Sequence, residues 1–281
     1  MRDSECTALL QWALPRMQLR WSGFRKVRRL VCKRIERRRA ALGLPDIMAY
    51  RQHLEATASE WDELRGLCTI PISRFCRDRG VFEALERIVL PQLAVRAADC
   101  GRGVVECWSA GCASGEEPYS LSMLWQLCVP ASRTAIALRI LATDIDSVLL
   151  ARAAKACYPK SALKEVPESW RSAAFESRGG QYCLRERFRR PVTFARQDLL
   201  RAMPEGPFDL ILCRNAAFTY LERPMQHRIA GQFAARLRPG GVLVIGIHEE
   251  LPTDAALLVP WSGIRSTFRK AEEEALSLDD A

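Results

Sequence analysis

The stretch 108-WSAGCASGEEPYSLSM-123 joins an apolar run to a bend of small residues and then to the start of a helix. The small residues at 110–115 let the backbone turn sharply and approach a ligand closely. Glu116, Glu117 and Pro118 follow, and a first helical turn favours both residue types, Pro for its fixed φ and Glu for its charge near the helix dipole. The stretch therefore predicts a strand, a tight bend and a helix in succession.

The same alternation of short apolar runs with helical stretches continues along the chain. Strands separated by helices of about a dozen residues indicate a mostly parallel sheet covered on both faces. We therefore predict an α/β fold with a doubly wound, Rossmann-like sheet, whose ligand lies at the carboxyl ends of the strands. The strand-like runs are VVECWSA at 104–110, LRILATD at 138–144, PVTFARQD at 191–198, FDLILCRN at 208–215 and GGVLVIGI at 240–247.

Acidic side chains follow the first two of these runs. Gly111 lies in the first bend, and Glu116 and Glu117 open the helix after it. These glutamates are either ligand-binding residues or simple partners of the helix dipole. Asp144 ends the second run, where a carboxylate can accept hydrogen bonds from a ribose diol. Asp146 is either a second acceptor or the cap of the next helix.

Polar residues also follow the later runs, with Asp198 and Leu199 after one and Arg214 and Asn215 after the next. Asp198 is placed to meet a base edge. The sequence contains no G-x-x-x-x-G-K-[ST] phosphate loop, and two adjacent carboxylates would repel a phosphate. A ribose and a base beside a positive centre, without a phosphate site, describe S-adenosylmethionine better than NAD or ATP.

The composition fits a folded protein that does not insert into a membrane. The chain has 281 residues, 48% of them hydrophobic and 27% charged, and no apolar run approaches the roughly 20 residues needed to cross a bilayer. Asp3, Glu5 and Pro15 interrupt the start of the chain, unlike a signal peptide. The eleven cysteines are odd in number and form no C-x-x-C pair. We therefore predict buried free thiols, no metal site, and a reducing cytoplasmic location.

The segment 16–39 is strongly basic, with eleven Lys or Arg residues against Glu36 alone. Its apolar residues recur at spacings of three and four, which predicts one helix with an apolar stripe, ending near Gly43 or Pro45. A second helix is predicted at 46–56, with Asp46 as its cap.

The basic face of this predicted helix is either solvated surface or a docking surface for an acidic partner. The two candidate partners are an acidic protein helix and a nucleic acid. Nucleic acid is the less favoured of the two, because Trp21 and Phe24 are the only aromatic residues there that could stack on bases.

Five stretches of the chain match one known family, and they are WSAGCASGEEPYSLSM, LATDID, AKACYPKSALKEVP, FDLILCRN and LRPGGVLVIGIHEEL. They resemble the chemotaxis receptor methyltransferase (CheR) family, and the likeness runs from about residue 20 to about residue 270. The resemblance implies methyl transfer from S-adenosylmethionine to glutamate side chains of bacterial chemoreceptors. It also implies an all-helical domain at 1–70, whose positive face meets the acidic receptor helices. A methyltransferase domain at 71–281 follows, with a small β insert within 158–192 that in the family can grip a receptor tail.

The resemblance adds three residues to the cofactor contacts that it assigns at the strand ends, which are Glu116, Glu117, Asp144, Asp198, Leu199 and Asn215. Ala216 joins Asn215 after the fourth run, and the stretch 71-PISRFCR-77 adds Ser73 and Arg77. In the family, the arginine of that stretch reaches both the cofactor and the substrate pocket.

The chain also departs from the family pattern. Pro71 replaces an asparagine, and Cys76 replaces an aromatic residue. Thr219 takes the place of a tyrosine that lies near the transferred methyl group, and Tyr220 comes one residue later. The family's His-Ser-Glu reads His-Glu-Glu at 248–250.

We hypothesise that Arg77 orients the acceptor carboxylate and that Tyr220 or Thr219 lines the path of the methyl group. A glutamate with a pKa of about 4.3 is already anionic at neutral pH, so the reaction requires no catalytic base. The departures leave two alternatives open. One is a regulatory module that binds S-adenosylmethionine without catalysis, and the other is a methyltransferase acting on a small acid or a nucleic acid.

Overall fold

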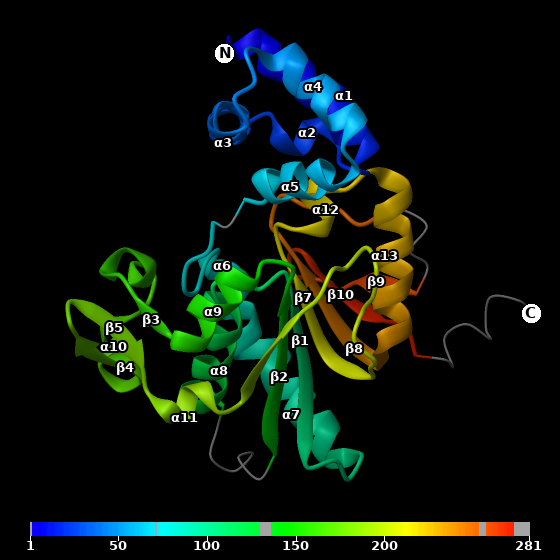
Figure 1. The fold of residues 1–281 in the computed structure, drawn as a ribbon. Helices are drawn as coiled ribbons and strands as arrows, with labels where there is room; N and C mark the ends of the chain where they lie inside the picture. The colour runs from blue at the N-terminus through cyan, green and yellow to red at the C-terminus, as the bar shows by residue number, and fades with distance from the viewer. Residues whose placement is uncertain (1, 71, 130–135, 253–256, 273–281) are drawn as a thin grey trace, which may run out of the picture. The chain divides into compact units, whose positions relative to one another are not determined.

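The computed structural model describes residues 2–70, 72–129, 136–252 and 257–272 (Figure 1). The chain forms two compact units, and one of them is discontinuous in sequence. The helical unit comprises Met1–Pro71 and Thr219–Gln226, and the sheet unit comprises Ile72–Phe218 and His227–Ala281. Pro71, one of the departures from the family pattern, lies outside the described residues.

The helical unit is built from α1 to α5, which enclose a core that includes the fully buried Leu10, Phe24, Ile35 and Tyr50. Among the described residues, its one buried carboxylate is Glu60. Glu60 accepts hydrogen bonds from the hydroxyl of Tyr50 and from the guanidinium of Arg38. The helices are α1 Asp3–Arg16, α2 Trp21–Phe24, α3 Arg28–Ala41, α4 Ile47–Ala56 and α5 Ala58–Cys68.

The predicted single helix over 16–39 is wrong, because the structure breaks it into α2 and α3 and an extended turn. Gln18 has a φ of 60°, outside the helical region. Leu19 then forms an antiparallel bridge with Leu221, and the amide of Arg20 donates to a carbonyl of the same distant segment. These partners lie about two hundred residues along the chain, so the local apolar spacing gave no sign of them.

The predicted apolar stripe, the end of the helix and the cap at Asp46 are confirmed. In α3 the apolar stripe includes the buried Val31 and Ile35, and the helix ends just before Gly43. Asp46 caps α4, since its Oδ1 accepts from the amide of Ala49 at 2.8 Å.

The sheet unit contains a seven-stranded sheet in the order β6-β2-β1-β7-β8-β10-β9. The five strands from β6 to β8 are parallel, and β10 runs antiparallel to both β8 and β9. The predicted α/β fold with a mostly parallel sheet is confirmed. The strands are β1 Val104–Ala110, β2 Ala137–Asp144, β6 Val192–Arg196, β7 Phe208–Cys213, β8 Leu237–Ile245, β9 Leu258–Pro260 and β10 Thr267–Lys270.

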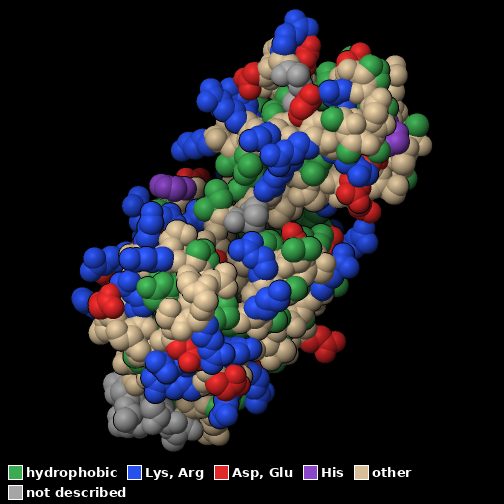
Figure 2. Space-filling model, turned by 60° about the vertical axis from the view of Figure 1, so that its left-hand side comes forward, with side chains coloured by type: hydrophobic (Ala, Val, Ile, Leu, Met, Phe, Trp, Pro, Cys, Tyr) green, Lys and Arg blue, Asp and Glu red, His purple; other side chains and the backbone are tan. Residues whose placement is uncertain are grey.

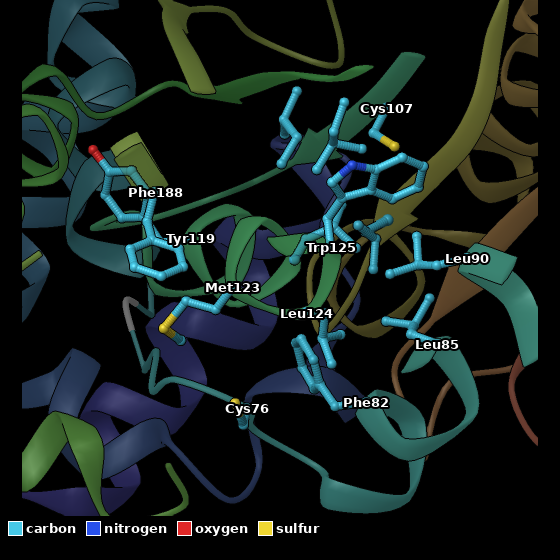
Figure 3. Close-up of a cluster of buried hydrophobic side chains, with 14 of the residues drawn as sticks. Cys76, Phe82, Leu85, Leu90, Cys107, Tyr119, Met123, Leu124, Trp125 and Phe188 are labelled. Carbon is cyan, nitrogen blue, oxygen red and sulfur yellow. The ribbon is translucent and has the colours of Figure 1, made fainter. Parts of the chain in front are cut away.

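Helices cover both faces of this sheet. On β1, Cys107 and Trp108 point to opposite faces, because side chains alternate along a strand. Cys107 belongs to a buried cluster with residues of α6 to α8 (Figure 3), whereas the Trp108 ring packs against Phe233 of α13 at 5.3 Å. The helices are α6 Arg79–Ala84, the π-helix η1 Leu85–Val89, α7 Leu90–Asp99, α8 Glu116–Cys128, α9 Ser147–Lys155, α12 Ala217–Tyr220 and α13 Arg223–Arg236.

A small insert between α9 and β6 carries its own three-stranded antiparallel sheet, in the order β3-β5-β4. Figure 1 shows it as a separate lobe of the sheet unit beside α9 and α11. Its elements are β3 Cys157–Tyr158, the 3-10 helix η3 Lys160–Leu163, α10 Glu168–Ala174, β4 Phe175–Arg178, β5 Gln181–Leu184 and α11 Glu186–Arg189.

Two disulfides correct the prediction that the cysteines are free thiols. Cys6 of α1 is bonded to Cys32 of α3, and Cys157 is bonded to Cys183, its direct partner in the β3-β5 pairing. Each bond spans 26 positions of sequence, so it depends on a long-range contact that cysteine spacing does not reveal. The other seven cysteines are free, and five of them are buried.

No helix in the described ranges is both long and apolar enough to span a membrane. On the face drawn in Figure 2, Lys and Arg side chains outnumber Asp and Glu, in keeping with the net charge of +9.

Replacing both Cys6 and Cys32 by Ser should lower the free energy of unfolding of the helical unit by about 3 kcal/mol, because the disulfide closes a loop of 26 positions in the unfolded chain. Denaturant unfolding of the double variant without reductant measures the change. Cys100→Ser, at an exposed free thiol, is the control and should leave stability unchanged. Equal stability of the double variant and the wild type would contradict the disulfide.

Candidate cofactor and active site

The bend after β1 brings the ends of three strands together. The amides of Gly111 and Cys112 both donate to the carbonyl of Thr143 at the end of β2, at 2.8 and 3.0 Å. Gly111 has a φ of 78°, and a Cβ built on it would lie 3.2 Å from the Cβ of Ala216, which follows β7. A side chain at this position would therefore be strained and would crowd the space between the strand ends.

Asp144 fixes the bend from the end of β2. Its Oδ2 accepts from the amide of Ala113 at 2.8 Å, and its Oδ1 accepts from the amide of Asp146 at 3.0 Å. Burial raises the pKa of Asp144 above its ordinary value, although these amide hydrogen bonds oppose the shift. The amide of Ile145 also stabilises the charged form, and a carboxylate with about four lone-pair sites still has capacity to accept from a ligand.

Asp146 acts as the cap of α9. Its Oδ1 accepts from the amides of Val148 and Leu149, at 2.8 and 3.1 Å. Of the two roles that the sequence left open for Asp146, the structure supports the helix cap.

The paired glutamates at the start of α8 have different environments. Glu116 is buried and accepts from the hydroxyl of Ser114 at 2.9 Å, and it forms no ion pair among the described residues. Glu117 accepts from the hydroxyl of Ser109 at 2.8 Å and from the guanidinium of Arg214 at 3.1 Å. Of these two glutamates, Glu117 is thus the one held by a positively charged side chain.

Arg214, at the end of β7, is the centre of a buried ion network. Its Nη2 donates to Asp78 Oδ2 and to the carbonyl of Arg77, both at 2.7 Å, and its Nη1 donates to Glu117. The guanidinium carbon lies 5.3 Å from the ring centre of Phe82, and the side chain is only 3% exposed. From the sequence, Arg214 was predicted only as a polar residue after a strand. A charged residue directly after the apolar run LILC at 210–213 was the available signal, because a buried charge requires partners.

The stretch that contains Arg77 is held against the first turns of α8. The amide of Cys76 donates to Ser120 Oγ at 2.9 Å, and Ser120 Oγ donates to the carbonyl of Glu116 at 2.6 Å. The half-buried Arg77 donates from Nη1 to the carbonyl of Ile72 at 2.6 Å. Burial raises the pKa of Cys76 to about 11, so this thiol is protonated at neutral pH.

Tyr158 of the insert, which the sequence analysis did not single out, supports both loops. Its hydroxyl donates to the carbonyl of Ser114 at 2.8 Å. Its ring meets that of Phe75 edge-on, with the ring centres 4.8 Å apart. The insert therefore contacts the bend after β1 and the stretch that leads to Arg77.

Glu249, which takes the place of the serine in the family's His-Ser-Glu, joins the ends of β7 and β8. Its Oε2 accepts from the amides of Asn215 and Gly246, at 2.8 and 2.7 Å. Asn215 has a φ of 55°, a left-handed conformation that Asn tolerates better than most residues. The role of Glu249 depends on a turn between strands and has no local sequence signature.

The remaining predicted site residues lie in three places. Asp198 and Leu199 are half-buried in the turn after β6, where Asp198 Oδ1 accepts from the amide of Leu200 at 2.9 Å. Ser73 is half-buried in the same stretch as Arg77. Thr219 and Tyr220, in contrast, belong to the helical unit.

These residues fit S-adenosylmethionine in charge and in hydrogen bonding. Glu116 and Asp144 supply negative charge for a sulfonium and an amino group, and Asp144 retains acceptors for a ribose diol. Gly111 adds no side chain to the narrow space between the strand ends. The same carboxylates would repel a phosphate, in agreement with the sequence prediction.

A family profile described as the CheR methyltransferase SAM binding domain matches residues 72–262. The chain belongs to the CheR methyltransferase family. The chemotaxis protein methyltransferase of Listeria monocytogenes is 39% identical over 208 residues, which cover 73% of this chain and 76% of the relative. The probable chemotaxis protein methyltransferase of Rhizobium etli is 34% identical over 250 residues, covering 85% and 90%.

Membership of the CheR family confirms the resemblance, the methyltransferase class and the use of S-adenosylmethionine. The matched segment contains the bend after β1, the Arg214 network and Glu249, so the described site lies within the SAM binding domain of the family.

Arg214→Ala should lower the free energy of unfolding of the sheet unit by roughly 3–5 kcal/mol, because it leaves Glu117 and Asp78 as unpaired charges in a buried site. Arg214→Lys should recover only part of the loss, since an ammonium lacks the planar fork. Arg265→Ala, at an exposed position of the same unit, serves as the control. Denaturant unfolding measures all three, and a loss below about 1 kcal/mol for Arg214→Ala would show that the network is not needed for stability.

Proposed function

We propose that this chain transfers the methyl group of S-adenosylmethionine to glutamate side chains of a chemoreceptor-like protein. The observation that carries the proposal is the CheR family match over residues 72–262, which contains the acidic strand-end site. Relatives named as chemotaxis protein methyltransferases support the choice of acceptor.

The proposed reaction needs no proton acceptor, which agrees with the residues in the site. The glutamate carboxylate is anionic at neutral pH and is the nucleophile. The site offers carboxylates, backbone amides and arginines, and the thiols of Cys76 and Cys112 are protonated because burial raises the pKa of both. The work of the protein is therefore to orient the carboxylate and to exclude water.

The cofactor, when bound, supplies a methyl group on a positively charged sulfur. We assign its binding to Glu116, Asp144 and Asn215, with Gly111 adding no side chain to the narrow space between the strand ends. Ser73, Asp198, Leu199 and Ala216 complete the proposed cofactor contacts. Glu117 has a different role in this proposal, because its charge is used to hold Arg214.

Arg77 is proposed to orient the acceptor carboxylate by charge-assisted hydrogen bonds. One of its N–H groups donates to the carbonyl of Ile72, and a guanidinium has four more. Its own carbonyl is held by Arg214, and the preceding amide is held by Ser120, so the backbone at Arg77 is fixed from two sides. Tyr220 or Thr219 is proposed to line the path of the methyl group.

For the acidic receptor helices, we propose docking on the exposed basic residues of the helical unit. Several of the arginines in the basic segment are turned inward, for example Arg34 toward carbonyls of α5 and its C-terminus and Arg38 toward Glu60. The exposed ones are left to meet a partner. Among them are Arg25, Lys26, Arg29, Lys33 and Arg37.

The proposed function is tested by calorimetry with S-adenosylmethionine and by a labelled-methyl assay on chemoreceptor cytoplasmic fragments from the host genome. Label that mild base releases as methanol identifies a carboxyl ester. Base-stable label would point to another acceptor, and cofactor binding without any label would point to a regulatory module. Either of these outcomes would overturn the proposal.

Arg77→Ala should lower the rate of methyl transfer by about 100-fold, because a charged hydrogen-bond donor to the acceptor is lost. Its affinity for S-adenosylmethionine should remain measurable by calorimetry. Arg79→Ala is the control, since Arg79 is exposed and forms only a surface pair with Glu83 among the described contacts. Transfer by Arg77→Ala at the wild-type rate would rule out this role.

A further inference from the structure

The segment after β7 is paired with the start of the basic segment inside the helical unit. The amide of Arg20 donates to the carbonyl of Tyr220 at 2.8 Å, and the amide of Glu222 donates to the carbonyl of Gln18 at 3.0 Å. Leu19 and Leu221 form the antiparallel bridge between these two bonds. The backbone of 219–222 is thus fixed by residues 18–20.

Side chains of the helical unit add to this pairing. Arg20 Nε donates to the carbonyl of Thr219 at 2.9 Å. The ring of Phe24, which is only 1% exposed, lies 5.0 Å from the ring of Tyr220. Both residues proposed to line the methyl path are therefore held by the helical unit, Thr219 through its backbone and Tyr220 through its backbone and its ring.

This arrangement requires glycine at position 23, because there is no space there for a side chain. A Cβ built on it would overlap the carbonyl oxygen of Thr219 and would lie 3.2 Å from Cδ1 of Tyr220. That oxygen belongs to backbone, so it cannot move aside as a flexible side chain would. Any side chain at position 23 must displace the Thr219–Tyr220 segment.

The same segment continues directly from the cofactor site along the chain. Asn215 and Ala216 follow β7, and α12 begins at Ala217 in the sheet unit and ends at Tyr220 in the helical unit. Only two residues separate Ala216 from Thr219.

We propose that Arg20, Gly23 and Phe24 are positioning residues for methyl transfer, which act by fixing the conformation of Thr219 and Tyr220. The proposal rests on the proposed function and adds a second task for the helical unit besides receptor docking. A unit that only docks the receptor would affect the KM for that substrate. A unit that also positions residues at the methyl path controls kcat, since a misplacement of about 1 Å can cost about 100-fold in rate.

The first test is Gly23→Ala, matched by Gly66→Ala in α5 of the same unit, where an added Cβ meets nothing within 4 Å. Gly23→Ala should lower kcat by about 10- to 100-fold. The Kd for S-adenosylmethionine and the KM for the receptor fragment should each stay within about threefold of wild type. Gly66→Ala should leave all three unchanged.

The second test covers the case in which Gly23→Ala fails to fold. Arg20→Met removes the donor to the Thr219 carbonyl with no added bulk and should also lower kcat, whereas Arg20→Gln keeps an N–H group at the position of Nε and should restore part of it. Hydrogen exchange of the Arg20 and Glu222 amides, which this pairing protects, should speed up in Arg20→Met and not in Gly66→Ala.

The outcomes separate the two proposals. If the wild type forms base-labile methyl esters and the Arg20 and Gly23 variants change only KM, docking is the whole role of these residues and the positioning inference is wrong. If both variants keep the wild-type kcat, the inference is equally wrong, while the proposed function stands. If the wild type binds the cofactor and forms no ester, the proposed function fails and the inference fails with it.

Discussion

The guanidinium of Arg214 joins three segments that are far apart in the sequence, and the geometry of the site depends on it. A buried arginine is stable only with partners, and here they are Asp78, Glu117 and the carbonyl of Arg77. These contacts fix the end of β7, the first turn of α8 and the loop before α6 relative to one another. Arg214 pairs with both Glu117 and Asp78, whereas Glu116 and Asp144 form no ion pair among the described residues.

This division of charge suits the proposed chemistry. Ester formation from a carboxylate and a sulfonium removes one negative and one positive charge, so a site that excludes water favours the product. A strong additional positive charge free beside the cofactor would oppose binding of the sulfonium. Pairing Arg214 on both sides with carboxylates keeps its charge from doing so, while its hydrogen bond still holds the backbone of Arg77.

Those parts of the fold that depend on local sequence patterns were predictable. The first four strand-like runs match β1, β2, β6 and β7, and the start of α8 at Glu116 follows from its Glu-Glu-Pro opening. The cap of α4 at Asp46 was equally clear, because capping needs only the next few residues.

Features that depend on contacts between distant residues were not predictable. The basic segment is broken at Gln18 because the next residue, Leu19, pairs with Leu221. The two disulfides likewise join cysteines from different elements. In the site, the roles of Arg214 and Glu249 appear only when the strand ends are side by side. The sequence indicates which residue types lie at these strand ends. Only the folded structure shows which of them bind one another.

The discontinuity of the helical unit also bears on how members of this family can be recombined. A chain that began at Ile72 would still contain Tyr220, with its ring no longer covered by Phe24 and its carbonyl no longer bonded to Arg20. Exchanging amino-terminal segments between two relatives would likewise place a foreign surface against residues 219–226. A functional chimera must therefore transfer both pieces of the unit together, so the boundary for recombination is set by packing and not by the order of the chain.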